Sequence, residues 1–156
     1  MIRFLRQFDP QAIRLLVFDL DGTLIDSRLD LIHSINAMLR HCDRPELPGE
    51  LIASYVGDGA PVLVRRALGE SAEETHFRAA LEYFLGYYRL HKLDHTVVYA
   101  GIPEVLARLS VPFNGTQRLM AVLSNKPVNP SRDIVQALGL GSYFVRIYGG
   151  NSFPTK

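Results

Sequence analysis

The protein has 156 residues, a formal net charge of +1 and 47% hydrophobic residues, which suits one ordinary domain or a small domain with an insert. The scattered basic residues argue against a nucleic-acid-binding stripe or a membrane-binding patch. No apolar run reaches the ~20 residues that span a bilayer, and residues 1–11 lack the apolar stretch of a signal peptide. The single cysteine, Cys42, excludes an internal disulfide, so we expect a cytoplasmic protein. From the scattered charge and the lack of a spanning segment, we expect neither a nucleic acid nor a membrane as partner.

The first predicted element is a β-strand. Residues 13–20 (IRLLVFDL) form a nearly continuous apolar run, which is typical of a strand that is buried on both faces of a parallel sheet. A turn signal follows at residues 21–23. Ser27 is predicted to cap an amphipathic helix of about four turns, because apolar residues recur after it at helical spacing.

The chain from Ser27 to about His95 is predicted to be entirely helical. After the first helix, the sequence predicts helices at residues 50–56, 61–69 and 71–91. The last of them follows Ser71-Ala72-Glu73-Glu74, which has the pattern of a capping box.

Alternation of helices and strands resumes after this helical segment. The predicted elements are a helix from Gly101 to Leu109, a strand from Leu119 to Leu123, a helix capped by Asn129, and a strand from Phe144 to Tyr148. Three strands that alternate with helices predict an α/β fold with a parallel, right-handed sheet. We therefore predict a core domain made of residues 1–26 and 96–156, and a helical cap domain made of residues 27–95.

Polar or glycine-rich segments follow all three predicted strands. They lie at residues 19–23, 124–126 and 149–151. Because ligands of parallel α/β sheets bind at the carboxyl ends of the strands, we expect these segments to meet at one site.

Asp19 and Asp21 are the strongest candidates for chemistry at that site. Two neighbouring carboxylates repel each other unless a cation or a shared proton offsets the repulsion, and Mg²⁺ prefers oxygen ligands. With Mg²⁺ bound, one carboxylate is able to attack phosphorus, and the other is able to serve as general acid and base. The alternative from the residues alone is a pair of solvated loop aspartates.

The segment from Asp19 to Ser27 (DLDGTLIDS) closely resembles the first motif of the haloacid dehalogenase superfamily. The resemblance implies a Rossmann-like core, an inserted helical cap, and a Mg²⁺-dependent phosphatase. In that family the first aspartate is the nucleophile and the second is the acid/base, and both help to hold the metal. Carried over, these are Asp19 and Asp21, while Gly22 and Thr23 are expected near the phosphate.

The segment from Leu123 to Pro127 (LSNKP) resembles the second motif of the same family. The resemblance implies that Ser124 and Asn125 hold a phosphoryl oxygen, although a turn-forming role is the alternative for Asn125. With the Gly149-Gly150 pair, the segment is most similar to the phosphoglycolate phosphatase branch, which implies 2-phosphoglycolate as substrate. Lys126 is then expected to meet the substrate carboxylate, with a solvated lysine as the alternative.

Two other functions stay open. A phosphoglucomutase-like enzyme would transfer the phosphoryl group to a sugar, and a catalytically incompetent chain would act only by association. The loop at residues 57–59 is expected either to lie over the site or to be a plain turn, and Arg65 is a further candidate for contact with an anionic substrate. His91 and His95 are four residues apart, but a helix surface or helix end is expected for them rather than a metal site.

The resemblance also implies motifs that follow the third strand. A third-motif lysine is expected at or near Lys156, and the acidic strand end that completes the Mg²⁺ site is absent from this sequence. We therefore expect an incomplete sheet and weak Mg²⁺ binding by Asp19 and Asp21 alone. The strand at residues 13–20 would then form an exposed apolar edge, which favours self-association.

Overall fold

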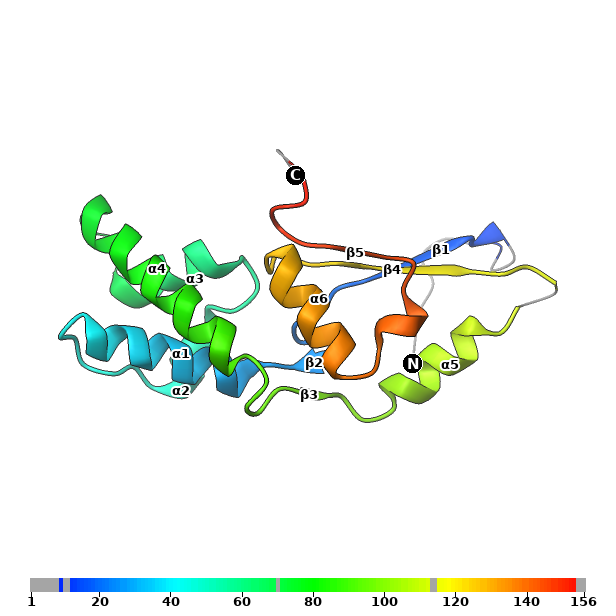
Figure 1. Ribbon diagram of the computed structural model, residues 1–156, viewed down its shortest axis with the longest axis horizontal. Coiled ribbons are helices and arrows are strands. Elements are labelled where there is room, and N and C mark those ends of the chain that lie inside the picture. The colour runs from blue at the N-terminus through cyan, green and yellow to red at the C-terminus, as the bar shows by residue number, and fades with distance from the viewer. Residues whose placement is uncertain (1–8, 10–11, 70, 113–114, 154–156) are drawn as a thin grey trace.

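The computed structural model describes residues 9, 12–69, 71–112 and 115–153. A helical half and an α/β half lie side by side and are joined by two short strands, as Figure 1 shows. We call the helical half, residues 27–95, the cap, and the α/β half the core.

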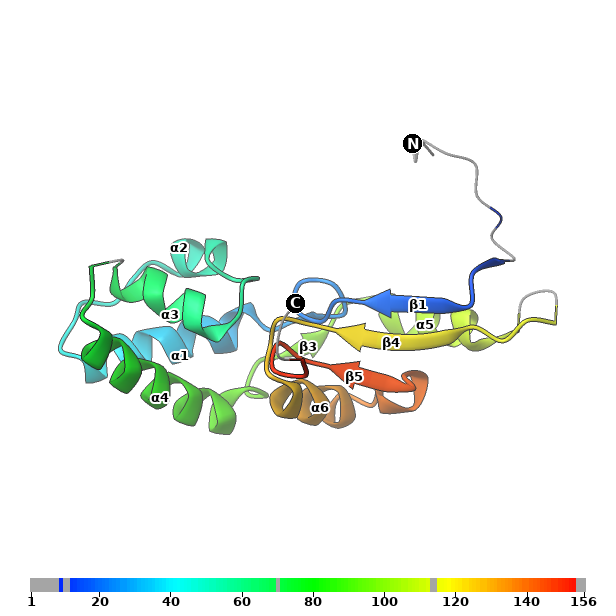
Figure 2. The ribbon, with the colours of Figure 1, turned by 90° about the horizontal axis from the view of Figure 1, so that it is seen from above.

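Among the described residues, the core contains a parallel sheet of three strands. Its strands are β1 (Leu15–Phe18), β4 (Leu119–Leu123) and β5 (Arg146–Tyr148), in the spatial order β1-β4-β5. Leu15 lies beside Leu119, and Leu123 lies beside Tyr148. Figure 2 shows the three strands running in the same direction, with their carboxyl ends toward the cap. The predicted α/β fold class is therefore confirmed.

Helices cover one face of this sheet. In Figure 1, α5 (Ile102–Ser110) and α6 (Val128–Ala137) lie below the strands, and the short 3₁₀ helix η2 (Gly141–Tyr143) follows α6. Alternate residues of β4 point toward these helices, because side chains of a strand alternate between its two faces. The cluster buried between sheet and helices includes Leu106, Met120, Val122, Ile134 and Val135.

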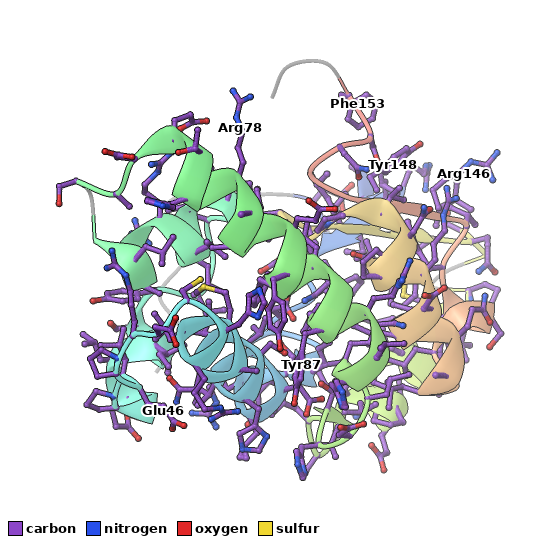
Figure 3. The ribbon with its side chains drawn as sticks, turned by 60° about the vertical axis from the view of Figure 1, so that its left-hand side comes forward. Glu46, Arg78, Tyr87, Arg146, Tyr148 and Phe153 are labelled. Carbon is purple, nitrogen blue, oxygen red and sulfur yellow. The ribbon has the colours of Figure 1, made fainter. Side chains whose placement is uncertain are left out.

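The opposite face of the sheet is open among the described residues. Leu15, Val17, Leu119 and Leu123 are 46–54% exposed, and β1 is an edge strand, as expected. Burial of this strand on both faces, which the apolar run predicts, is not observed, because both helices lie on the same side. Figure 3 shows Phe153 near Tyr148, the last residue of β5, and their ring centroids are 5.2 Å apart.

We expect the open face to drive self-association of a protein made of these 156 residues. Association would bury apolar side chains and would pair the free edge of β1. Val17→Lys places a charge on this face and is expected to weaken association by about tenfold or more. Sedimentation of the protein over a range of concentrations measures this change.

Leu90→Lys is the matched control for the open face, since Leu90 is an exposed leucine of the cap. Its self-association is expected to equal that of the unmodified protein. A protein that stays monomeric at all concentrations would contradict the prediction.

Four helices make up the described part of the cap, and they surround a separate buried cluster. These are α1 (Arg28–His41), α2 (Gly49–Ser54), α3 (Ala60–Leu68) and α4 (Glu74–His91). The cluster includes Leu31, Ile35, Met38, Val64, Phe84 and other residues, all from these helices. Because this cluster and the core cluster share no residue, we propose the cap as a domain of its own.

Two short strands connect the core to the cap. The first, β2 (Ile25–Asp26), pairs antiparallel with the second, β3 (Val97–Val98), so the chain enters and leaves the cap side by side. Strands of two residues have no visible sequence period, and neither was predicted. Arg28 at the start of α1 forms an ion pair of 2.6 Å with Asp26.

Of three predicted helix caps, Ser27 is in its predicted position, and the other two differ from the structure. The capping box at Ser71 does not form, because α4 begins at Glu74 and Glu73 makes no side-chain capping bond. Asn129 lies inside α6, which begins at Val128. Ser27 does occupy the N-cap of α1, but its hydroxyl makes no capping bond. Among the described helices, none has the length and hydropathy needed to cross a membrane.

Candidate active site

A cavity of about 420 Å³ lies between the cap and the carboxyl ends of the core strands. Polar and charged side chains line the core side, and mostly apolar side chains line the cap side. The core contributes, among others, Asp19, Asp21, Ser124, Asn125, Lys126 and Asn151. The cap contributes, among others, Val56, Leu63, Phe84, Tyr88, Arg89 and Lys92.

A tight turn after β1 brings two aspartates to this cavity. The backbone N–H groups of Thr23, Leu24 and Ile25 all lie near the Leu20 carbonyl oxygen, at 3.0–3.3 Å. Gly22 has a φ of +78°, a conformation that glycine adopts without steric cost. The chain therefore reverses within a few residues, and the carboxylates of Asp19 and Asp21 both line the cavity.

The two aspartates differ in their partners. Ser27 donates its hydroxyl to Oδ1 of Asp21 at 2.5 Å, and Lys126 Nζ lies 3.3 Å from Oδ2 of Asp21. No described residue makes a hydrogen bond or ion pair with the side chain of Asp19. Asp21 is thus held in place, while the exposed Asp19 carboxylate is available to a substrate or metal ion.

Lys126 is a buried cation that joins the core to the cap. Its side chain is 6% exposed, and Nζ donates to the hydroxyl of Tyr88 on α4 at 2.7 Å. Burial alone would lower the pKa of Lys126, but the charge of Asp21 and the contact with Tyr88 outweigh burial and raise the pKa. Lys126 is therefore charged at neutral pH, and because its side chain is buried, the alternative of a solvated lysine is wrong.

The loop after β4 places Ser124 and Asn125 beside the aspartates. Ser124 is buried, and its Oγ accepts a hydrogen bond from the Lys126 backbone N–H at 3.2 Å. Asn125 donates to the Gly57 carbonyl of the cap at 2.6 Å. The loop at residues 57–59 therefore contacts the core beside the cavity, which agrees with the prediction that this loop lies over the site.

The glycine pair after β5 allows the third strand end to approach the other two. A Cβ on Gly149 would lie 2.2 Å from the Val128 nitrogen, and one on Gly150 would lie 2.5 Å from the Asn125 carbonyl oxygen. Residues with side chains would therefore push these loops apart. The next residue, Asn151, accepts a hydrogen bond from the Val128 N–H at 2.8 Å and lines the cavity.

Several predicted contacts are not part of the cavity lining. Gly22 and Thr23 are exposed in the turn and are not among the lining residues, so their phosphate-binding role stays a prediction. Lys156 lies outside the described residues.

Arg65 is also held away from the cavity. Its guanidinium donates to the Ala72 carbonyl at 3.1 Å, pairs with Glu74 at 2.8 Å, and lies 3.6 Å from the centre of the Phe77 ring. The cap cations that do line the cavity are Arg89 and Lys92 of α4, and Lys92 pairs with Asp133 at 3.3 Å. Sequence reasoning missed them because a helix does not show from its sequence which face meets another domain.

Asp19 and Asp21 fit a Mg²⁺ site in their chemistry. Both offer carboxylate oxygens at the cavity, and Mg²⁺ prefers such ligands. The Asp21 carbonyl is not used by the hydrogen bonds of the turn. Among the described residues, no third acidic or histidine side chain joins these two in a metal-ligating group.

Comparison with known proteins gives a consistent family. The family of haloacid dehalogenase-like hydrolases matches residues 16–156. Phosphoglycolate phosphatase from Chromobacterium violaceum is 36% identical over an alignment of 148 residues, and the match covers 92% of this chain and 65% of that protein. Phosphoglycolate phosphatase 1 from Pseudomonas aeruginosa is 40% identical over an alignment of 155 residues, and the match covers 96% of this chain and 55% of that protein.

A solved structure supports the same assignment. The crystal structure of a predicted phosphoglycolate phosphatase from Haemophilus somnus has a TM-score of 0.83 and 31% identity, over 92% of this chain and 65% of that one. The chain thus spans less than two thirds of the length of these relatives. The family match, the parallel sheet and the paired aspartates agree, and the chain belongs to the family of haloacid dehalogenase-like hydrolases.

Proposed function

We propose that this protein hydrolyses a small phosphate monoester, with 2-phosphoglycolate as the first candidate, through an aspartyl-phosphate on Asp19. One observation carries the proposal: Asp19, Asp21, Ser124 and Lys126 come from two strand ends and line the same cavity. The names of the relatives support a phosphatase and point to phosphoglycolate.

In the first step, a carboxylate oxygen of Asp19 attacks phosphorus in line with the leaving oxygen. A bond forms between Asp19 and phosphorus while the bond to the leaving oxygen breaks. Asp19 suits this role because no described side chain occupies its carboxylate.

Asp21 moves the protons of both steps. In its protonated form it gives a proton to the leaving alkoxide. As a carboxylate it then removes a proton from the water that attacks the aspartyl-phosphate, which releases inorganic phosphate and restores Asp19. The contacts of Asp21 with Ser27 and Lys126 fix its position for these transfers.

The remaining polar groups stabilise negative charge. Ser124 is placed to hold a phosphoryl oxygen, and the charge of Lys126 favours an anion in the cavity. Mg²⁺ held by Asp19 and the Asp21 carbonyl would supply screening between the attacking carboxylate and the phosphate.

Arg89 is the cap cation that we assign to the substrate carboxylate. It lines the cavity, and no described side chain pairs with its guanidinium. Lys126 is less suited to this role than the sequence suggests, because Asp21 and Tyr88 already contact its ammonium group.

Release of inorganic phosphate from a panel of phosphate monoesters tests the proposal. With Mg²⁺ present, 2-phosphoglycolate is expected to be hydrolysed with the highest kcat/KM, and chelation of the metal is expected to stop hydrolysis. No Mg²⁺-dependent turnover of any ester would contradict the proposal and would favour a chain that acts only by association.

The size of the cavity favours including larger esters in the same panel. Its volume of about 420 Å³ and its apolar cap side leave room for more than the two carbons of phosphoglycolate. A phosphoglucomutase-like enzyme is the second candidate for this reason. Transfer of the phosphoryl group from one position of a sugar to another, without release of phosphate, would replace the first candidate by the second.

A further inference from the structure

A buried carboxylate at the start of the cap forms hydrogen bonds with the segment that leaves the cap. Asp30, in the first turns of α1, is only 1% exposed. Its Oδ1 accepts a hydrogen bond from the His95 N–H at 2.9 Å, and its Oδ2 accepts bonds from the N–H and hydroxyl of Thr96 at 2.9 and 2.6 Å. The start of the cap is thereby tied to the segment that leaves it.

Two histidines lie beside this carboxylate. His33 follows Asp30 by one helical turn, so both side chains lie on the same face of α1. The rings of His33 and His95 pack edge to face, with centroids 5.1 Å apart. One donor atom from each of Asp30, His33 and His95 lies within 4.8 Å of the other two.

We propose that Asp30, His33 and His95 form a binding site for Zn²⁺ or a chemically similar transition-metal ion. Two imidazole nitrogens and one carboxylate oxygen are ligands that Zn²⁺ accepts at about 2.0–2.2 Å, so small side-chain rotations bring all three to one ion. Mg²⁺ prefers oxygen ligands and is disfavoured here. Because both imidazoles are exposed, the ion enters from solvent and completes its coordination with water.

The environment of Asp30 prepares it for this role. Ligating carboxylates in proteins are commonly held by hydrogen bonds to neighbouring groups. Here the backbone of His95 and Thr96 already holds the Asp30 carboxylate without an ion. Oδ1 accepts one hydrogen bond, from the His95 N–H at 2.9 Å, while Oδ2 accepts the other three, from the His95 N–H, the Thr96 N–H and the Thr96 hydroxyl. A lone pair of Oδ1 therefore remains for the metal.

The proposed site is separate from the candidate active site. None of its three residues lines the cavity between cap and core. An ion bound here would link α1 to the segment before β3, and it would stabilise the folded protein by mass action. Zn²⁺ binding by these three residues is independent of phosphatase activity and is measurable in a protein that has none.

Calorimetric titration of the untagged protein with Zn²⁺ tests the proposal. The titration is done in excess Mg²⁺, which occupies sites with oxygen ligands, such as Asp19 and Asp21. The unmodified protein is expected to bind one Zn²⁺ with a micromolar or tighter dissociation constant. His33→Ala and His95→Ala each remove one ligand and are expected to weaken this binding at least about tenfold. Titration with Co²⁺ is expected to give the absorption bands of a nitrogen-ligated ion, and these bands are expected to be lost in both variants.

His76→Ala is the matched control, because His76 is an exposed histidine of the cap outside this group. It is expected to bind Zn²⁺ as the unmodified protein does. The thermal unfolding midpoint is expected to rise with Zn²⁺ for the unmodified protein and the control, and not for the two ligand variants. Absence of Zn²⁺ binding, or binding that either ligand variant retains, would overturn the three-residue site.

Discussion

Replacing Asp19 by Asn is expected to lower kcat for phosphate monoester hydrolysis by about 10⁴-fold or more, because the variant lacks the attacking carboxylate. The neutral amide has nearly the same shape, and no described side chain depends on a contact with Asp19. The fold is therefore expected to persist. Steady-state release of inorganic phosphate measures the loss, and mass spectrometry after an acid quench is expected to detect a phosphoryl group on the unmodified protein alone.

Asp43→Asn is the matched control for this substitution. Asp43 is an exposed carboxylate outside the cavity lining, and its φ of +54° is one that asparagine tolerates well. The control is expected to keep full activity. Turnover by Asp19→Asn at the rate of the control would exclude an aspartyl-phosphate on this residue.

Replacing Lys126 by Met is expected to cost about 100-fold or more in kcat/KM. The substitution keeps the length and apolar stem of the side chain but removes the cation 3.3 Å from Asp21. An anionic substrate then loses a favourable charge, and truncating one partner of a buried ion pair costs several kcal/mol in general.

The pH dependence separates this role of Lys126 from simple loss of structure. Burial alone would lower the pKa of Lys126, but the charge of Asp21 and the contact with Tyr88 raise it, so this lysine loses its charge only at high pH. A fall in kcat/KM at high pH, as Lys126 loses its proton, is therefore expected for the unmodified protein and is expected to be absent in Lys126→Met.

Lys92→Met is the matched control for the buried lysine. Lys92 also lines the cavity and forms an ion pair of 3.3 Å, but its partner Asp133 is 58% exposed. Exposed pairs contribute little, so the control is expected to lose less than about tenfold in kcat/KM. Equal losses in both variants, with the fall at high pH retained in Lys126→Met, would contradict a special role of Lys126.

The closed arrangement of the site depends on both halves of the molecule. Tyr88 and Gly57 of the cap contact Lys126 and Asn125 of the core. Lys126 therefore touches the proposed acid/base and the cap at once. Displacement of the cap would remove the Tyr88 hydroxyl from Lys126 and open the cavity to water.

The sequence determined the elements that local patterns control. The strand at Leu119–Leu123 was predicted with its observed bounds, and the start of α3 near Pro61 with its end at Gly69 also followed from the sequence. The convergence of Asp19, Asp21 and Ser124 followed as well, because parallel strands necessarily present their carboxyl ends at one edge. These features depend on periodicity, on the fixed φ of proline and on the positive φ of glycine, all of which act within a few residues.

The tertiary structure alone decided which side chains become partners. Ser27 lies at the N-cap of α1, yet its hydroxyl donates to Asp21. Arg65 forms an ion pair with Glu74, whereas Arg89 lines the cavity. Lys126 donates a hydrogen bond to Tyr88, which is 38 residues away in the sequence, and Asp30 accepts one from His95, which is 65 residues away. Such contacts depend on how the cap packs against the core, and the hydrophobic effect that drives packing is non-directional, so the residue pattern does not specify these pairs.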